Sequence, residues 1–288
     1  LYGGDFIRRT TLTNPALETT TSEALLAKIQ DLLGKQHEVL YYGPQSEKEV
    51  TEALTAHHKT PAELQPLEKK HVQLLPTDES RVLMAQYDAK QLYYMQFSNL
   101  GKQFDVTADP EITLYNEYFG GGMNSIVFQE MREARGLAYS AAARIMQPGY
   151  ADRNYGYMAF IATQNDKMQT AIEAFDEIIN NMPESEAAFN IAKDGLISRL
   201  RTDRTVKDQV LWSYIDQRDM GLTEDRNKQI FEKVQSMTLA DVKTAQEKWV
   251  KDRKYVYGIL GDIQDLNLNY LKTLGPIQTV SQEEIFGY

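Results

Sequence analysis

The sequence predicts an α+β fold in which an antiparallel sheet is packed by helices on one face. Two observations lead to this class: β-prone runs arrive in hairpins ahead of a long helical stretch, and one helix–strand–glycine segment occurs twice. The 288 residues, 42% of them hydrophobic, suffice for a sizeable core and favour two units over one. We therefore expect one complete copy of the unit together with the tail of a preceding copy.

The first elements of the complete copy follow a polar stretch that carries prolines. Short apolar runs predict strands over 72–75, 82–87 and 92–97, the last two separated by the residues DAKQ. A helix is expected over 109–119, where Pro110 suits the first turn. A second helix is expected over 124–135.

A hairpin and three helices come next. Strands are expected over 137–146 and 155–163, because the segment QPGYADRN between them has the residues of a hairpin turn. Apolar residues at helical spacing predict helices over 167–181, 185–202 and 206–220. Strands followed by a run of helices indicate an α+β layer rather than a parallel α/β sheet.

The repeated segments are TSEALLAKIQDLLGKQHEVLYYGP at 21–44 and TLADVKTAQEKWVKDRKYVYGILGD at 238–262. Each begins with a threonine suited to cap a helix, continues with apolar residues at helical spacing, and gives a short β-rich run that ends at glycine. Leu25 and Val242 lie 217 positions apart and Gly43 and Gly261 lie 218 apart, a difference of one loop residue. Chance likeness of two helix–strand segments is the alternative, but the matched order and spacing favour a domain duplication.

A repeat of this length leaves only the second copy nearly complete within the chain. We expect residues 1–67 to be the C-terminal tail of a preceding, truncated unit, 68–275 to be the complete domain, and 276–288 to be a C-terminal tail. The boundary is expected in the polar stretch 57–71. The N-terminal LYGGDFIRRTT reads as a cut into a longer polypeptide, so any export signal upstream would be invisible.

Composition excludes several classes of function. The chain carries 41 Asp and Glu against 31 Lys and Arg, and its net charge of −10 argues against nucleic acid or anionic lipid as the main partner. It has no cysteine, which excludes thiolate chemistry, disulfides and Cys-ligated metals. No apolar run approaches the ~20 residues that a membrane span needs, so we expect a soluble chain whose compartment stays undetermined.

The glycine triplet Gly120, Gly121 and Gly122 raises the question of a nucleotide site. A Walker loop needs a lysine after its glycines, but Met123 and Asn124 follow here. A dinucleotide fingerprint needs a preceding strand, whereas ITLYNEYF reads as helix. The favoured interpretation is a helix–glycine–helix corner, in which glycine supplies a positive φ, Asn124 or Ser125 caps the second helix, and Gly136 ends it.

The stretch FGGGMNSIVFQEMREARGLAYS closely resembles a segment of the M16 peptidases, the zinc metallopeptidases with an inverted motif. The glycine triplet, Met-x-Ser, the Phe-Gln-Glu-x-Arg-Glu run and Arg-Gly-Leu-Ala-Tyr-Ser agree in order and spacing. The likeness continues to the ending YGILGD, and the duplication fits it, because such proteins look like tandem copies of an α+β unit.

The resemblance implies a catalytic H-x-x-E-H motif that binds zinc, which this chain lacks. Its four histidines are His37, His57, His58 and His71, and they do not have the spacing of the motif. We therefore predict no metal site and no cofactor here, and expect zinc in a missing N-terminal half.

The family's C-terminal half, by this resemblance, engages the substrate through an arginine and a tyrosine seven residues apart. Arg132 and Tyr139 match in type and spacing. The expected role is therefore the C-terminal, zinc-free half of an M16-type zinc endopeptidase, inactive alone, which binds extended peptide beside a zinc-bearing half or subunit. One alternative is a non-catalytic partner subunit of a heteromeric protease, and another is a nucleotide-dependent enzyme that uses the glycine loop.

Overall fold

The computed structural model describes residues 1–67 and 72–286 and contains one six-stranded sheet with the strand order β3-β4-β2-β5-β1-β6. The strands are β1 Arg81–Gln86, β2 Gln91–Gln103, β3 Ser140–Met146, β4 Asn154–Gln164, β5 Val256–Gly261 and β6 Ile277–Thr279. The expected strands over 82–87, 92–97, 137–146 and 155–163 correspond to β1 to β4. Strand β2 continues six residues beyond its expected end, and β3 begins three residues after its expected start.

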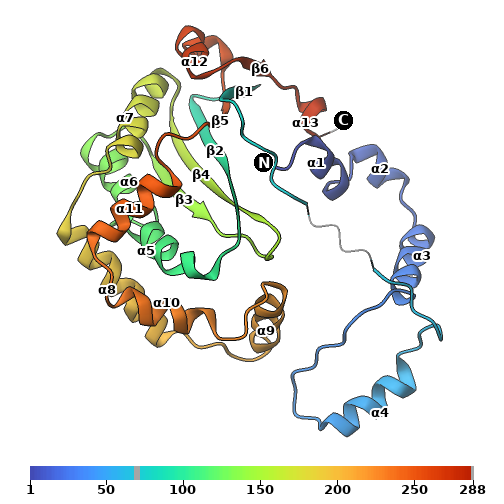
Figure 1. The fold of residues 1–288 in the computed structure, drawn as a ribbon. Helices are drawn as coiled ribbons and strands as arrows, with labels where there is room; N and C mark the ends of the chain where they lie inside the picture. Colours follow the sequence, from blue (N-terminus) through green and yellow to red (C-terminus); the bar gives the residue numbers. More distant parts are fainter. Residues whose placement is uncertain (68–71, 287–288) are drawn as a thin grey trace.

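Helices cover one face of this sheet, as the fold class predicts. Figure 1 shows α5 to α8, α10 and α11 gathered on one side of the sheet and α1 to α4 on the other side, apart from it. The helices after β2 are α5 Asp109–Phe119, α6 Ile126–Phe128, α7 Met168–Asn180, α8 Glu186–Thr202, α9 Gln209–Asp219, α10 Arg226–Val234, α11 Leu239–Trp249, α12 Leu268–Leu274 and α13 Gln282–Phe286. None of the helices in the described ranges is long and apolar enough to cross a membrane.

The core lies between the helices and the sheet face that they cover. Residues alternate along the strands, so that every second side chain enters this layer. The bulkiest side chains that are fully buried there are Tyr94, Tyr115, Tyr118, Phe119, Tyr155, Tyr157, Phe175 and Trp249. Their burial fixes the register of the sheet, because a slip by one residue would carry each strand's large apolar side chains to the other face.

The α+β class is confirmed, but the sheet is mixed rather than wholly antiparallel. Strands β3, β4, β2 and β5 pair antiparallel in that order, whereas β1 pairs parallel with both β5 and β6. The reason is the position of β5. Successive strands β1 and β2 run in opposite directions, and a strand inserted between them must be parallel to one of the two.

The run 72–75, expected as a strand, does not form one. It crosses the face of the sheet opposite the helices, where Asn99 Nδ2 donates to Leu74 O at 3.0 Å. Gly156 lies beneath it, since a Cβ there would come within 3.2 Å of Leu74 Cδ1. The backbone of this segment is therefore held by a hydrogen bond from a side chain of β2 and not by pairing with a strand.

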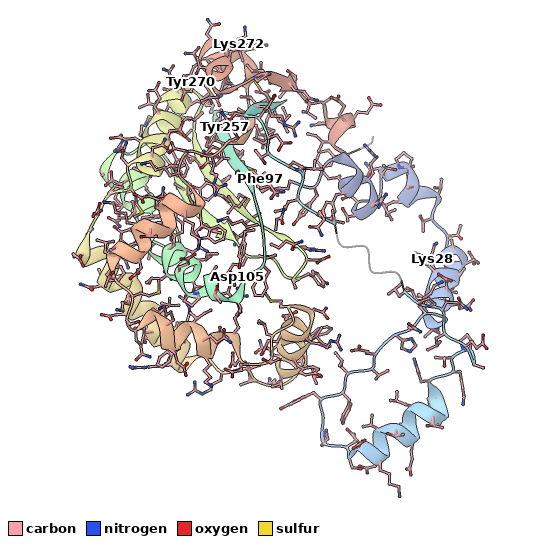
Figure 2. The ribbon with its side chains drawn as sticks, viewed as in Figure 1. Lys28, Phe97, Asp105, Tyr257, Tyr270 and Lys272 are labelled. Carbon is pink, nitrogen blue, oxygen red and sulfur yellow. The ribbon has the colours of Figure 1, made fainter. Side chains whose placement is uncertain are left out.

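The two segments predicted to be copies of one repeat differ in the surroundings of their helices. In the second copy α11 and β5 form as predicted, and Val242, Ala245 and Trp249 are buried. In the first copy α3 Ser22–Leu33 forms and Thr21 caps it, but Leu25 and Ile29 are both 55% exposed. Lys28 marks α3 in Figure 2, apart from the sheet.

The β-rich run expected before Gly43 forms no strand. In the second segment, β5 is paired with β1 on one side and β2 on the other. Among the described residues no strand pairs with 38–42, so the backbone there has no such neighbour. The other helices of this N-terminal part are α1 Gly4–Thr10, α2 Asn14–Thr19 and α4 Glu47–His57. The start of the complete domain was placed at 68, and residues 68–71, with His71, lie outside the described ranges.

At the other end of the chain, the predicted C-terminal tail contributes to the sheet. Strand β6 begins two residues after the expected domain end at 275 and pairs with β1 from Val82↔Ile277 to Met84↔Thr279. The sheet therefore includes residues that the sequence analysis assigned to the C-terminal tail. Residues 287 and 288 lie outside the described part.

Candidate functional site around Arg132 and Tyr139

The glycine triplet forms the corner between α5 and α6, but its first residue serves a different purpose from the one predicted. None of the three has a positive φ, so the expectation of a left-handed turn residue is wrong. Instead, a Cβ at Gly120 would lie 1.9 Å from Ala143 O, and one at Gly121 would lie 2.7 Å from Asn116 O. Gly120 is needed because the backbone of β3 approaches too closely for a side chain, and Gly121 because the end of α5 does.

Asn116, on the last turn of α5, joins the same helix to the edge strand. Its side chain accepts from Ile145 N at 2.8 Å and donates to Ile145 O at 2.9 Å. Both backbone groups of Ile145 on the free edge of β3 are thereby paired. The glycine corner thus faces the protein's own strand, an arrangement that leaves the nucleotide interpretation without structural support.

The segment expected as one helix over 124–135 has two parts. Ser125 caps α6, its Oγ accepting from Phe128 N at 3.4 Å, and the chain then continues as a π-helix, η2 Gln129–Ala134. The wider hydrogen-bond spacing appears in Arg135 N, which donates to Glu130 O at 3.2 Å. Gly136, with a φ of 58°, ends the helix as predicted. Single π-turns of this kind are frequent at functional sites.

The structure brings the two predicted residues together. The Arg132 guanidinium lies 5.7 Å from the centre of the Tyr139 ring and 4.9 Å from the centre of the Phe128 ring. These distances fall within the range of cation–π contact. The Arg132 side chain is 45% exposed and Tyr139 is 76% exposed, so both polar groups are open to a ligand.

The neighbouring charges leave Arg132 as the more available cation. Arg135 Nη1 donates to Glu177 Oε2 at 2.7 Å, and this hydrogen bond raises the pKa of the Arg135 guanidinium. Arg132 Nε lies 3.5 Å from Glu133 Oε1, beyond a short hydrogen bond. The ion pair with Glu133 is the one that the described residues give Arg132, and both of its side chains are about half exposed.

Tyr139 is held at a bend in front of β3. Its backbone N donates to Ala162 O at 2.9 Å, and Ala162 is also the register partner of Ser140. Two successive residues therefore face one residue of β4, which is the arrangement of a β-bulge. Bulges of this kind redirect a side chain at the end of a strand.

Two contributors to the site were missed or misassigned from the sequence. Phe128 follows the buried Ile126 and Val127 on α6, yet it is only partly buried and its ring lies against the Arg132 guanidinium. An aromatic residue four positions before an arginine on a helix is the signal that could have indicated this pair. Met123, 73% exposed in the glycine corner, had no such signal.

The residues present do not fit a zinc site. His37 and His58 face each other with their Nε2 atoms 2.7 Å apart, and the Nδ1 atom of His37 lies 2.6 Å from Lys35 O. These nitrogens bind one another and the backbone, and no group of three or more His, Cys, Asp or Glu side chains in the described ranges could hold a metal ion. The described side chains therefore provide no set of ligands for a zinc ion.

A hollow of about 420 Å³ lies at the far end of β3, around the hairpin to β4. Asn116, Arg144 and Arg153 are among the residues that line it. Arg132 and Tyr139 are not in its lining, so the candidate pair lies on open surface rather than in this hollow.

Comparisons with known proteins agree with this architecture. The family described as peptidase M16 inactive domain matches residues 21–196. Three solved structures are similar. A peptidase M16 inactive domain from Pseudomonas fluorescens has 18% sequence identity and a TM-score of 0.62, and the match covers 86% of this chain and 59% of that one. A conserved protein from Enterococcus faecalis V583 has 16% identity and a TM-score of 0.67 (87% of this chain and 58% of that one), and a protease from Helicobacter pylori has 15% identity and a TM-score of 0.58 (86% and 61% of the two chains).

At such identities the likeness to the solved structures concerns the fold. The chain spans about three fifths of the length of the structures it matches, and none of the curated proteins compared with it matches. The family match covers more than half of the chain, including the glycine corner, the π-helix and the Arg132–Tyr139 pair. The chain therefore belongs to the M16 peptidase family, in its inactive, zinc-free domain.

Proposed function

We propose that this chain is the zinc-free half of an M16-type zinc endopeptidase and that it holds an extended peptide opposite a metal-bearing half. The observation that carries the proposal is the pairing of Arg132 with Tyr139. Two side chains with strong hydrogen-bond donors lie together on open surface, positioned by a π-helix and a bend before the edge strand.

The chemistry of the two groups suits the recognition of a peptide bond under attack. The exposed Tyr139 hydroxyl can donate to the scissile carbonyl oxygen, where negative charge grows in the transition state. The Arg132 guanidinium can donate to a neighbouring peptide carbonyl through its forked N–H groups. Its contact with the Phe128 and Tyr139 rings restricts where that fork points, which lowers the entropy lost when a peptide binds.

The alternative function is that of a non-catalytic partner subunit in a heteromeric M16 protease. The absence of a metal-binding group from the described residues favours a supporting role in either case. The two functions differ in what Tyr139 does: in the first it acts during cleavage, and in the second the partner cleaves equally well without its hydroxyl.

The deciding experiment uses the Tyr139→Phe variant, combined with the polypeptide from the same cells that carries H-x-x-E-H. Cleavage of an internally quenched fluorescent peptide is followed, together with zinc content. We expect kcat to fall by about 100-fold, since loss of one oxyanion donor has an effect of this size. Zinc content and the melting temperature should not change.

Tyr214→Phe is the matched control, because Tyr214 is another exposed tyrosine (63%) and lies on α9. This control should cleave like the wild-type protein. If Tyr139→Phe also cleaves at the wild-type rate, the catalytic role is wrong and the partner-subunit function is favoured.

A further inference from the structure

The face of the sheet opposite the helices is largely apolar and open. We call it the open sheet face and define it by Tyr93 and Met95 on β2, Met158 and Phe160 on β4, and Leu260 on β5, which alternate along their strands with side chains that enter the core. Met95 is 40% exposed and Leu260 is 37% exposed. Among the described residues, the segment 72–75 covers the far end of this face, where Phe97, labelled in Figure 2, is buried.

Aromatic rings give the open sheet face a rigid surface. The Tyr93 and Phe160 rings are stacked with centres 6.0 Å apart and planes 23° apart, and the Tyr87 ring lies 6.3 Å from that of Tyr93. Beside Met95 the face dips at Gly258, where an added Cβ would meet Met95 Cβ at 3.6 Å. Stacked rings next to a dip can receive large apolar side chains with little loss of entropy.

The open sheet face is continuous with the Arg132–Tyr139 site. Ser140, which follows Tyr139, is in register with Ala162, and Ala162 is in register with Tyr93, which pairs with Leu260. This row places Tyr93 two strand spacings, about 10 Å, from Ser140. An extended peptide advances about 3.3 Å per residue, so about three residues cover that distance.

The charge on this face is opposite in sign to that of the whole chain. The positions of β2, β3, β4 and β5 that point to this side include no Asp or Glu, although the chain carries a net charge of −10. Arg144 on β3 is the charged residue among them, in register with Met158. No salt bridge joins Arg144 to a carboxylate within residues 1–67 and 72–286, so its charge is free for an anionic group.

We propose that the open sheet face binds the apolar side chains of the extended peptide held at Arg132 and Tyr139, and that Arg144 binds an acidic residue of the same peptide. This inference rests on the proposed function and specifies its substrate class: peptides with a large apolar or aromatic residue about three positions from the bond at Tyr139, and a carboxylate nearby. The complementary partner is an acidic, apolar peptide rather than a basic one.

Binding to the 288-residue chain alone tests this without any cleavage. The probes are three fluorescein-labelled ten-residue peptides: one with two Phe residues and one Glu in a Gly/Ser background, one with both Phe replaced by Ser, and one with Glu replaced by Lys. Fluorescence anisotropy gives each Kd. We expect the first peptide to bind at least about tenfold more tightly than the second, the effect of burying one large apolar side chain.

Variants of the open sheet face should remove this preference. Met95→Ser and Leu260→Ser should each weaken binding of the Phe peptide by about tenfold, and Arg144→Glu should make the Lys peptide bind better than the Glu peptide. Leu17→Ser is the matched control, since Leu17 is 55% exposed on α2, away from the sheet. Melting temperatures of all variants establish that they fold.

The outcomes separate this inference from the proposed function. Equal Kd values for the Phe and Ser peptides, or wild-type binding by folded Met95→Ser, would overturn the inference even if Tyr139→Phe abolishes cleavage. Sedimentation that shows a dimer dissociated by Met95→Ser would also overturn it, because a second copy would then cover the face. If instead the face variants lose binding and Tyr139→Phe cleaves normally, the peptide surface stands and the catalytic role of Tyr139 fails.

Discussion

Tyr139, just before β3, is far more exposed than the strand tyrosines that point into the core. Tyr94, Tyr157 and Tyr257 are at most 7% exposed, whereas Tyr139 is 76% exposed. Burial of an aromatic ring is among the larger stabilising contributions available to a side chain. A ring left in solvent beside an arginine therefore contributes little to folding, and its exposure supports a role in contact with a ligand.

The residue scale also shows where sequence reasoning stops. The spacing of Arg132 and Tyr139 was visible in the sequence, but a tyrosine at the start of a strand is usually half-buried. The bend at Tyr139, where its backbone N donates to Ala162 O, turns the ring outward. The glycine triplet predicted a corner correctly. The atom that requires Gly120, the carbonyl oxygen of Ala143, belongs to a strand formed later in the chain, and no local pattern could indicate it.

Gly120→Ala tests that close approach. The new Cβ would overlap Ala143 O, which is backbone and cannot rotate away, so we expect the free energy of unfolding to fall by at least about 2 kcal/mol. Gly122→Ala is the control, because no atom lies within 4 Å of a Cβ there. It should change stability by no more than ~0.5 kcal/mol. Urea unfolding measures both, and equal losses would show that the corner needs glycine for another reason.

At the scale of elements, periodicity predicted α5, α7, α8 and α9 to within a few residues, but α10 and α12 were not predicted and the sheet order was not. The helix over 109–119 is reproduced residue for residue by α5 because its apolar spacing and Pro110 are local signals. The helical periodicity did not distinguish the π-turn of η2 from an α-helix, and the insertion of β5 between β1 and β2 depends on pairing distant in sequence. The open sheet face could not be predicted for the same reason, since strand order decides which residues become neighbours.

The matched helices of the repeat give a second stability test. Val242 on α11 is fully buried, whereas Leu25, its counterpart on α3, is 55% exposed. Val242→Ala should cost about 2 kcal/mol of unfolding free energy because it leaves a cavity, and Leu25→Ala should cost ~0.5 kcal/mol or less. We propose that α3 is covered only within the preceding unit of the duplication. A large loss from Leu25→Ala in this chain would contradict that.

At the scale of the whole molecule, acid titration of the helical layer should influence stability. Asp176 on α7 lies at the edge of the core, and burial, with a smaller effect of the nearby Glu173 carboxylate, raises its pKa from 3.8 to about 6. The Asp176 charge also acts on five tyrosines, two of which are labelled in Figure 2. They are Tyr94, Tyr157, Tyr255, Tyr257 and Tyr270.

The sign of the effect follows from the direction of this pKa shift. Between about pH 4 and pH 6, Asp176 is protonated in the folded state and ionised in the unfolded state. The folded state therefore binds one more proton than the unfolded state, and the free energy of unfolding falls as the pH rises through this range. Asp176→Asn removes the titration. We expect the variant to gain on the order of 2 kcal/mol over the wild-type protein at pH 7.5 and almost nothing at pH 4.

Urea unfolding of both proteins at several pH values checks this, since the difference between them isolates Asp176 from the other carboxylates. Asp208→Asn, at an exposed position before α9, is the control and should follow the wild-type curve at every pH. A constant difference between the Asp176→Asn variant and the wild-type protein from pH 4 to pH 7.5 would show that the carboxyl does not titrate in this range. The difference in stability would then reflect packing or hydrogen bonding, and the raised pKa of Asp176 would be contradicted.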